Sequence, residues 1–290
     1  MRRRANYIIK MDALKVLTTL LSAVAVATVT VLAVLGTAPA ASAASADHGA
    51  SFSVRCDFSH RASDDPIVHF GHPGASHSHD FFGNRSTDAN STYKSMLKAG
   101  TTCTRPLDKA GYWMPSLRWD GERINPGRAV FYYRAGGKDN KKVKPFEGGL
   151  KMITDSHIKW RCGRRNDSDT APRRCSNNLL GVRFTFPDCS NGKLDSHNHM
   201  AHMAYSERID GEIRCPRSHP IPVPVLVMNV TFPLPTSRGP VRLFSGRPST
   251  AHADFFNTWN QGELRRLVSD CINNVAPSKP RPTGCKKLGR

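Results

Sequence analysis

The feature that most limits how this chain can fold is a set of eight cysteines that follows an N-terminal export signal. An exported chain meets an oxidising environment in which paired cysteines persist, so we expect four disulfides and no free thiol. Eight cysteines allow about 105 pairings, and the simplest prediction joins cysteines that are neighbours in the sequence. No two of them are spaced as Cys-x-x-Cys, which argues against a zinc ribbon and a thioredoxin-like redox site. The predicted neighbour pairs include Cys162 with Cys175 and Cys271 with Cys285.

The export signal has the three parts of a signal peptide. Basic residues lie at positions 2–4 and 10, residues 16–35 are mostly apolar, and Ala-Ser-Ala occurs at both 41–43 and 44–46. An uncleaved anchor is the alternative, because about 20 apolar residues can span a bilayer. The two adjacent small-x-small sites favour cleavage. We therefore predict a signal peptide over residues 1–43, a secreted, extracellular protein, and no stable membrane insertion after cleavage.

The mature chain is strongly basic. Cleavage after residue 43 removes five of the 42 basic and one of the 23 acidic residues, which leaves a net charge of +15. The basic residues cluster at 138–144 and 161–174, in stretches rich in Gly, Asn and Asp that are typical of solvated loops. These clusters lack interleaved aromatic residues for base stacking, so we expect no specific nucleic-acid partner. A glycan or an anionic cell-wall polymer is the expected partner, attracted by general electrostatics.

Short runs of β-type residues dominate the rest of the chain. Asp-Gly between alternating residues predicts a hairpin over 117–124, and further strands are expected at 129–134, 158–162, 182–186 and 223–232. Prolines at 222, 224 and 233 indicate that the last of these is an edge strand or a strand that starts late. Helices are expected at 92–99 and 263–273. The fold class predicted is mainly β with a few short helices (α+β), as a single disulfide-stabilised β-sandwich-like domain over residues 50–275, followed by a basic, Pro-rich tail over 276–290.

The histidines gather beside acidic residues in a few short segments. Alternate residues of a strand share a face, so His77 and His79 can reach one centre. Around Asp195, a strand would align His197 and His199 with the carboxylate, whereas a helix would align His199 and His202 with it. Imidazole with carboxylate is the usual ligand set for zinc, and for copper, iron or manganese at other geometries. A carboxylate can instead orient a histidine that acts as an acid or a base.

These segments predict one shared His/Asp site, whereas the isolated His48, His60 and His157 are interpreted as hydrogen-bonded loop or core residues. Zinc or copper is the expected metal. The expected metal ligands are His77, His79, His199, His202 and His252. The expected catalytic residues are His79, Asp80, Asp195, His199 and Asp254.

Other catalytic signatures are missing, since the chain has no GxSxG, HExxH, P-loop or GxGxxG motif. All eight cysteines are expected to be paired, so none is a candidate nucleophile. Trp113, Trp119 and Trp259 could stack on sugar rings, with core packing as the alternative.

Several multi-residue blocks occur together in a fixed order. They are Asp65-Pro66-Ile67-Val68, the His-x-His segment at 77–79, Phe186-Pro187-Asp188-Cys189, residues 194–205, residues 215–220 and His252-Ala253-Asp254-Phe255. In these blocks the chain resembles, over about residues 52–271, a family of exported bacterial and fungal proteins known only as a domain of unknown function. Fungal members are often joined to the WSC carbohydrate-binding domain. The family pattern is Asp-Ser-x-Asp-His where this chain has Asp-Ser-His-Asn-His at 195–199. The resemblance names no reaction and implies an extracellular setting among glycans.

Three hypotheses of function follow from these patterns. The first is a metal-dependent or acid/base hydrolase acting on extracellular polysaccharide. The second is a non-catalytic cell-surface protein that binds a metal or a glycan. In the third, the histidines and aspartates form a buried hydrogen-bond network with a purely structural role.

Overall fold

The computed structural model describes residues 50–163, 167–275 and 283–285. The predicted signal peptide over 1–43 lies outside the described residues, as does the predicted tail over 276–290 apart from the short 3-10 turn Thr283–Cys285. No helix among the described residues is long and apolar enough to cross a membrane.

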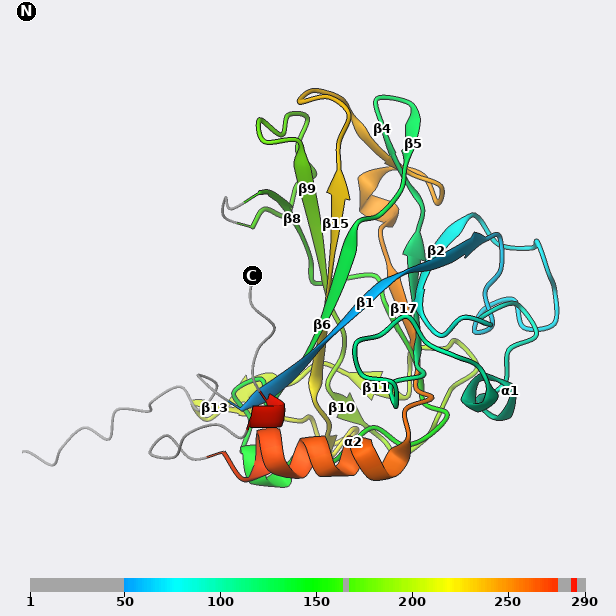
Figure 1. Ribbon diagram of the computed structural model, residues 1–290. Helices are drawn as coiled ribbons and strands as arrows, with labels where there is room; N and C mark the ends of the chain where they lie inside the picture. Colours follow the sequence, from blue (N-terminus) through cyan, green and yellow to red (C-terminus); the bar gives the residue numbers. More distant parts are fainter. Residues whose placement is uncertain (1–49, 164–166, 276–282, 286–290) are drawn as a thin grey trace, which may run out of the picture. The chain divides into compact units, whose positions relative to one another are not determined.

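The described chain is built on a nine-stranded antiparallel sheet (Figure 1). In spatial order its strands are β7 (Lys151–Thr154), β17 (Ala253–Phe256), β3 (Gly111–Pro115), β2 (His79–Gly83), β1 (Ser51–Ala62), β6 (Arg128–Arg134), β15 (Val225–Pro233), β9 (Leu179–Thr185) and β8 (Ile158–Cys162).

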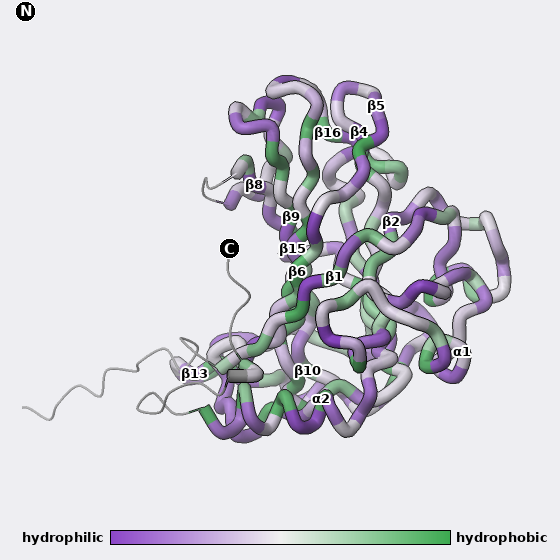
Figure 2. The backbone as a smooth tube through the Cα atoms, in the orientation of Figure 1, coloured by the Kyte–Doolittle hydropathy of each residue, from purple (hydrophilic) through white to green (hydrophobic). Residues whose placement is uncertain are grey.

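Strand β1 divides this sheet into two halves. Residues 51–57 of β1 pair with β6, whereas residues 58–62 pair with β2, and the register shifts between Phe58 and His60. A bulge of this kind bends a strand and lets it pass from one layer to another. The two halves then face each other: Tyr112 of β3 stacks on Phe131 of β6 with ring centroids 3.8 Å apart. The predicted mainly β, sandwich-like fold is therefore confirmed, and hydrophobic residues run along the strands that enclose the core (Figure 2).

Smaller elements complete the fold. A second sheet contains β16 (Val241–Leu243), β4 (Leu117–Trp119) and β5 (Glu122–Ile124); a third contains β11 (Met203–Ala204), β10 (Cys189–Ser190) and β14 (Ile221–Pro222); and β12 (Glu207–Ile209) pairs with β13 (Glu212–Arg214). The helices are α1 (Tyr93–Lys98) and α2 (Gln261–Val268), and α2 continues into a π-helical turn, Ser269–Asn273. Two further 3-10 turns are Asn140–Lys142 and Pro248–Thr250.

Local sequence signals explain several of these elements. Asp120 and Gly121 both adopt positive φ angles, 53° and 84°, as the predicted two-residue hairpin turn between β4 and β5 requires. Thr92 caps α1 by accepting a hydrogen bond from the Ser95 backbone N–H. The edge-strand interpretation of residues 223–232 is wrong, because β15 lies between β6 and β9. Its prolines are tolerated because the strand starts late, at Val225, and Pro233 is its last residue.

The disulfide prediction is confirmed in both number and pairing. Every cysteine is bonded to its neighbour in the sequence, and none is free. The pairs are Cys56–Cys103, Cys162–Cys175, Cys189–Cys215 and Cys271–Cys285. One basic loop differs from the prediction: Lys138 is buried in an ion pair with Asp188.

The core between the two halves contains a polar network centred on Asp108. The Tyr112 hydroxyl donates to Asp108 Oδ2 over 2.9 Å and lies 2.6 Å from the Tyr133 hydroxyl, which accepts from Trp259 Nε1. Burial raises the pKa of Asp108 to about 8, although its bonds with Tyr112 and the Ala110 backbone oppose the rise. Asp108 is therefore a neutral carboxylic acid at pH 7.

This raised pKa predicts how stability depends on pH. The folded chain holds the Asp108 proton up to about pH 8, whereas the unfolded chain releases it near pH 4. The contribution of this group to the free energy of unfolding is thus largest below pH 4 and falls as the pH rises to 8. Guanidinium unfolding at pH 5, 7 and 9 should show a smaller loss of stability with rising pH for Asp108→Asn than for the wild type. Parallel pH profiles for the two proteins would contradict the assignment.

Candidate metal centre

The half of the large sheet that contains β2, β3, β17 and β7 has two faces. Its inner face is turned toward the main core, and its outer face is covered by a separate group of residues. Phe82 and Phe255 belong to the main core, whereas Phe81 and Phe256 pack in a small outer cluster completed by Ile67, Met96 and Trp113. Because side chains alternate along a strand, the outer face also carries every second residue from these positions. Two residues before Phe81, β2 therefore carries His79 on this outer face. Two and four residues before Phe256, the same face carries Asp254 of β17 and His252, which directly precedes β17.

Three imidazole rings meet at one end of this outer face. The ring centroids of His77 and His79 are 4.3 Å apart, and those of His77 and His252 are 5.0 Å apart. One ring nitrogen from each of the three lies within 4.8 Å of the others. His79 is fully buried, whereas His77 and His252 are half-buried. The sequence thus brings together residues 175 positions apart, through the pairing of β2 and β17 with the shared neighbour β3.

The hydrogen bonds of these rings determine which nitrogens remain available. His79 Nδ1 donates to the Asp64 carbonyl over 2.9 Å, and His252 Nδ1 donates to the Thr250 carbonyl over 2.9 Å. Because a carbonyl oxygen can only accept, both Nδ1 atoms carry the proton and each neutral ring has a bare lone pair on Nε2. These two Nε2 atoms face each other at 3.4 Å, so neither has a proton to share with the other. The buried His77 Nε2 also has no hydrogen-bond partner within the described chain.

Facing lone pairs of this kind suit a metal ion. Two nitrogens bound at about 2.0–2.1 Å to one tetrahedral zinc lie about 3.3–3.4 Å apart, which is the separation of the Nε2 atoms of His79 and His252. Backbone carbonyls that hold the other ring nitrogen are the usual supports of metal-binding histidines. His79 and His252 could therefore hold a metal ion with no change of tautomer, and His77 adds a third ring to the group.

The electrostatic surroundings keep all three rings neutral. Burial, followed by the charges of His252 and His69, lowers the pKa of His77 to about 4. Burial and the two neighbouring rings hold the pKa of His79 well below its ordinary value. Burial also lowers the pKa of His252, although its bond to Thr250 opposes the change. Neutral imidazole is the form that binds a metal.

Two carboxylates flank the histidines. Asp65, His79 and Asp254 each place one possible ligand atom within 4.8 Å of the others. Asp65 Oδ1 accepts hydrogen bonds from the backbone N–H groups of Ile67 and Val68, which anchor it in the turn after β1. Both carboxyl oxygens of Asp254 are buried without a partner in the described chain. Burial raises the pKa of Asp254 well above its ordinary value, and the charge of Asp65 raises it further.

Asp80 lies on the opposite face from this cluster. It follows His79 directly in β2, so its side chain points to the inner side, where Oδ1 accepts from Arg61 Nε over 2.5 Å and from Ser116 Oγ over 2.8 Å. The sequence prediction placed Asp80 beside His79 in one site, and strand alternation separates them. A further group, Cys56, Cys103 and Asp108, lies close together, but both sulfurs are in a disulfide and cannot bind a metal as thiolates.

The other predicted site residues form a second cluster at the far end of β7. Asp195 Oδ1 accepts from His199 Nδ1 over 3.0 Å, and Asp195 Oδ2 is 3.4 Å from Lys151 Nζ. His202 contacts Ser196 Oγ and donates to the Lys151 carbonyl. Burial alone would raise the pKa of Asp195, but its bonds from His199 and the Ser196 N–H hold it below its ordinary value.

This second cluster is separate from the three-histidine centre. Lys151 pairs with Phe256 and Thr154 pairs with Ala253, so the clusters lie at opposite ends of β7, about 10 Å apart along the strand. His199 and His202 are not among the residues that meet His77, His79 and His252. The local arrangement is a turn in which His199 adopts a φ of 58°, neither the strand nor the helix considered from the sequence.

Sequence reasoning missed Asp65 as a member of the site. Its signal was the Asp-Pro-Ile-Val block, but only the turn that brings this block against β2 and β17 reveals its proximity to His79. The three tryptophans considered for sugar stacking, Trp113, Trp119 and Trp259, are all fully buried and belong to the interior.

Comparison with known proteins gives one match. A family model described as Domain of unknown function (DUF1996) matches residues 65–259, a span that begins at Asp65 and includes His77, His79, His252 and Asp254. No curated protein and no solved structure matches the chain.

The geometry predicts that a metal stabilises the protein through His77. Zinc at about 100 times its dissociation constant should stabilise the wild type by about 2.7 kcal/mol, which raises Tm by about 5–10 °C. His77→Ala should abolish this rise and leave Tm without metal nearly unchanged, because His77 Nε2 has no hydrogen-bond partner to lose.

Thermal melts of tag-free protein with and without Zn²⁺ or Cu²⁺ measure both effects. The control is His197→Ala, which removes an exposed histidine from the loop that contains Asp195 and His199, and this variant should keep the full metal-dependent rise in Tm. A wild type without a metal-dependent rise, or a His77→Ala variant that keeps it, would rule out the centre.

Proposed function

The chain belongs to the family described as a domain of unknown function (DUF1996), and we propose that this member is a secreted metal-dependent hydrolase of extracellular polysaccharide. The single observation that carries the proposal is the pair of bare Nε2 atoms of His79 and His252, 3.4 Å apart. Their Nδ1 protons are already donated to backbone carbonyls, so the pair has no hydrogen-bonding explanation and suits a cation.

The donor set favours zinc with a free coordination position. Three neutral imidazoles form the ligand set of catalytic zinc sites, in which water or substrate takes the fourth position. A zinc ion held by His77, His79 and His252 would supply an activated water, whose pKa falls to about 7 on such a metal. His77 and His252 are half-buried, and these two rings would border the side of the site that is open to a substrate.

Asp254 is suited to donate a proton in this reaction. Cleavage of a glycosidic bond needs an acid that protonates the departing oxygen, and a carboxyl group with a raised pKa performs this role in glycosidases. Burial raises the pKa of Asp254 well above its ordinary value, which favours the protonated form that such an acid needs, and Asp254 lies beside His79. Asp65 would act as a positioning residue, since its negative charge helps to keep the proton on Asp254.

The chemistry of the whole chain supports an extracellular site of action. All eight cysteines are in disulfides, which persist in oxidising compartments. The N-terminal sequence has the parts of a signal peptide, and the chain without it has a net charge of +15. A basic secreted protein is attracted to acidic polymers at cell surfaces.

A non-catalytic metal-binding role is the second candidate, and one observation favours it. His79 is fully buried, as expected for a ligand of a closed site whose metal has a structural role. In that role Asp254, which lies beside His79 but outside the three-histidine group, would move closer to become the fourth ligand, and no position would remain for water.

Asp254→Asn separates the two candidates. Asn has the shape of the neutral carboxylic acid, so the variant should keep its fold and its metal-dependent rise in Tm. If Asp254 is the proton donor, release of reducing ends from polysaccharide should fall about 100-fold or more. Asp155→Asn, a change at an exposed carboxylate beside His252, is the matched control and should keep its rate.

Reducing-end assays on a panel of neutral and acidic polysaccharides measure the rate, and metal analysis of each variant measures occupancy. Cleavage that survives in both Asp254→Asn and His77→Ala would refute the proposed mechanism. Stoichiometric metal with no cleavage of any polymer would favour the binding role instead.

A further inference from the structure

Three arginines form a line across the small sheet β16-β4-β5. The register pairs Arg242 of β16 with Arg118 of β4, and Arg118 with Arg123 of β5. Residues directly opposite each other in antiparallel strands point to the same face, so the three guanidinium groups leave the sheet on one side. Their strand neighbours Leu117 and Leu243 are buried on the other side. We call Arg242, Arg118 and Arg123 the arginine row.

The arginines of this row form no direct ion pair within the described chain, although the charge of Arg123 acts on Asp80 from a longer distance. All three side chains are exposed, and none takes part in an ion pair with the acidic residues among 50–163, 167–275 and 283–285. Like charges placed directly opposite each other destabilise a sheet. Folding alone therefore does not explain three arginines in register, whereas an anionic ligand that bridges them would.

Phe244 holds two of the guanidinium groups in place. Its ring lies 4.3 Å from Arg118 Cζ and 4.1 Å from Arg123 Cζ. Stacking on an aromatic face restricts a guanidinium and leaves its N–H edges free to bind a carboxylate through two parallel hydrogen bonds. Because the arginines cover the ring, Phe244 does not offer a face on which a nucleic-acid base could stack.

The row is connected to the metal centre at two points. The Phe244 N–H donates to the Ser116 carbonyl, and the Ser116 N–H donates over 2.8 Å to the carbonyl of Ser78, the residue between His77 and His79. Further along the same segment, the Thr250 carbonyl accepts from His252 Nδ1. The segment that carries Arg242 and Phe244 thus continues to a histidine of the metal centre.

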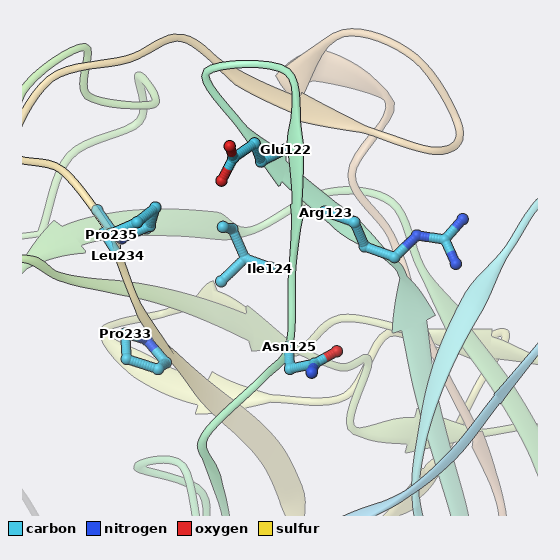
Figure 3. Close-up of a pocket in the computed structure, with 7 residues that line it drawn as sticks. All are labelled: Glu122, Arg123, Ile124, Asn125, Pro233, Leu234 and Pro235. Atoms are coloured by element: carbon cyan, nitrogen blue, oxygen red, sulfur yellow. The ribbon is translucent and has the colours of Figure 1, made fainter.

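A pocket on β5 lies on the other side of the strand from the row. It is lined by Glu122, Arg123, Ile124, Asn125 and Pro233–Pro235, and Figure 3 shows the Arg123 guanidinium extending away from Glu122 and Ile124. On the side of Arg123, Arg61 is bound to Asp80 and to Asn125. Arg61 is therefore the arginine in direct contact with Asp80, whereas Arg123 of the row forms no ion pair in the described chain.

We infer that the arginine row binds the carboxylates of an acidic, uronate-containing polysaccharide and holds that polymer beside the metal centre; its cleavage there rests on the proposed function. Neighbouring strands lie about 4.8 Å apart, so the backbone positions of the three arginines repeat at roughly that interval, and an extended chain with one carboxylate on each sugar ring offers several carboxylates to the row.

Binding by the row is tested without metal, so that it is independent of hydrolysis. Chelator-treated wild type should bind polygalacturonate more tightly than a neutral glucan of the same length in calorimetry at 50 mM salt. The variant Arg118→Gln/Arg123→Gln/Arg242→Gln should bind it about tenfold more weakly or worse. The control Lys94→Gln/Lys98→Gln/Arg265→Gln removes the same charge from exposed residues of α1 and α2 and should bind like the wild type.

The outcomes separate this inference from the proposed function. Equal losses in the two triple variants would overturn it in favour of general electrostatics, and so would tighter binding to a polyol phosphate or to nucleic acid. Single Arg242→Gln, which leaves the Phe244 stack intact, should show a partial loss if the triple variant does not fold. Row-dependent binding without cleavage would support the arginine row and count against the hydrolase.

Discussion

The change of partner along β1 is the constraint on which the rest of this structure depends. One strand of 12 residues pairs with β6 along its first part and with β2 along its second, with a bulge between Phe58 and His60. The bend at this point brings the two halves of the sheet face to face, so that Tyr112 stacks on Phe131 across the core. It also gives the second half an outer face away from the main core, and the three-histidine centre is on that face.

The polar cluster on the outer face contains buried polar atoms that have no hydrogen-bond partner in the described chain. An unpaired buried polar group destabilises a protein by about 1–3 kcal/mol, and a structural network would satisfy such groups. The Asp108 network in the core does so, because Tyr112, Tyr133 and Trp259 are joined in one chain of hydrogen bonds. The outer cluster does not, since His77 Nε2 and both oxygens of Asp254 have no partner in the described chain. This contrast favours a ligand over a structural role for the outer cluster.

The basic side chains of the described chain fall into two groups that also differ in whether they have a partner. Where basic side chains support the fold they are paired, as Lys138 is with Asp188 and Arg61 is with Asp80. The arginine row is exposed, in register and without such partners in the described chain, and its segment leads directly to His252. In the proposed function, this cationic surface would attract an acidic polymer toward the neutral imidazoles that would hold the metal.

The sequence by itself determined that the eight cysteines pair, the mainly β fold class and the gathering of histidine with carboxylate, because cysteine number, β-type runs and local composition can be read without the fold. Which of the about 105 cysteine pairings forms was decided by the tertiary structure, which has the simplest one, between neighbours in the sequence. The sequence could also have shown that Asp254 shares a face with a site histidine and that Asp80 does not, since side chains alternate between the two faces of a strand. His79 and Asp80 are adjacent and diverge, whereas His252 and Asp254 are two apart and share a face. Only the tertiary structure decided that His77, His79 and His252 meet while His199 and His202 stay at the other end of β7. That choice depends on β3 pairing with both β2 and β17, a contact between segments far apart in the chain that no local pattern encodes.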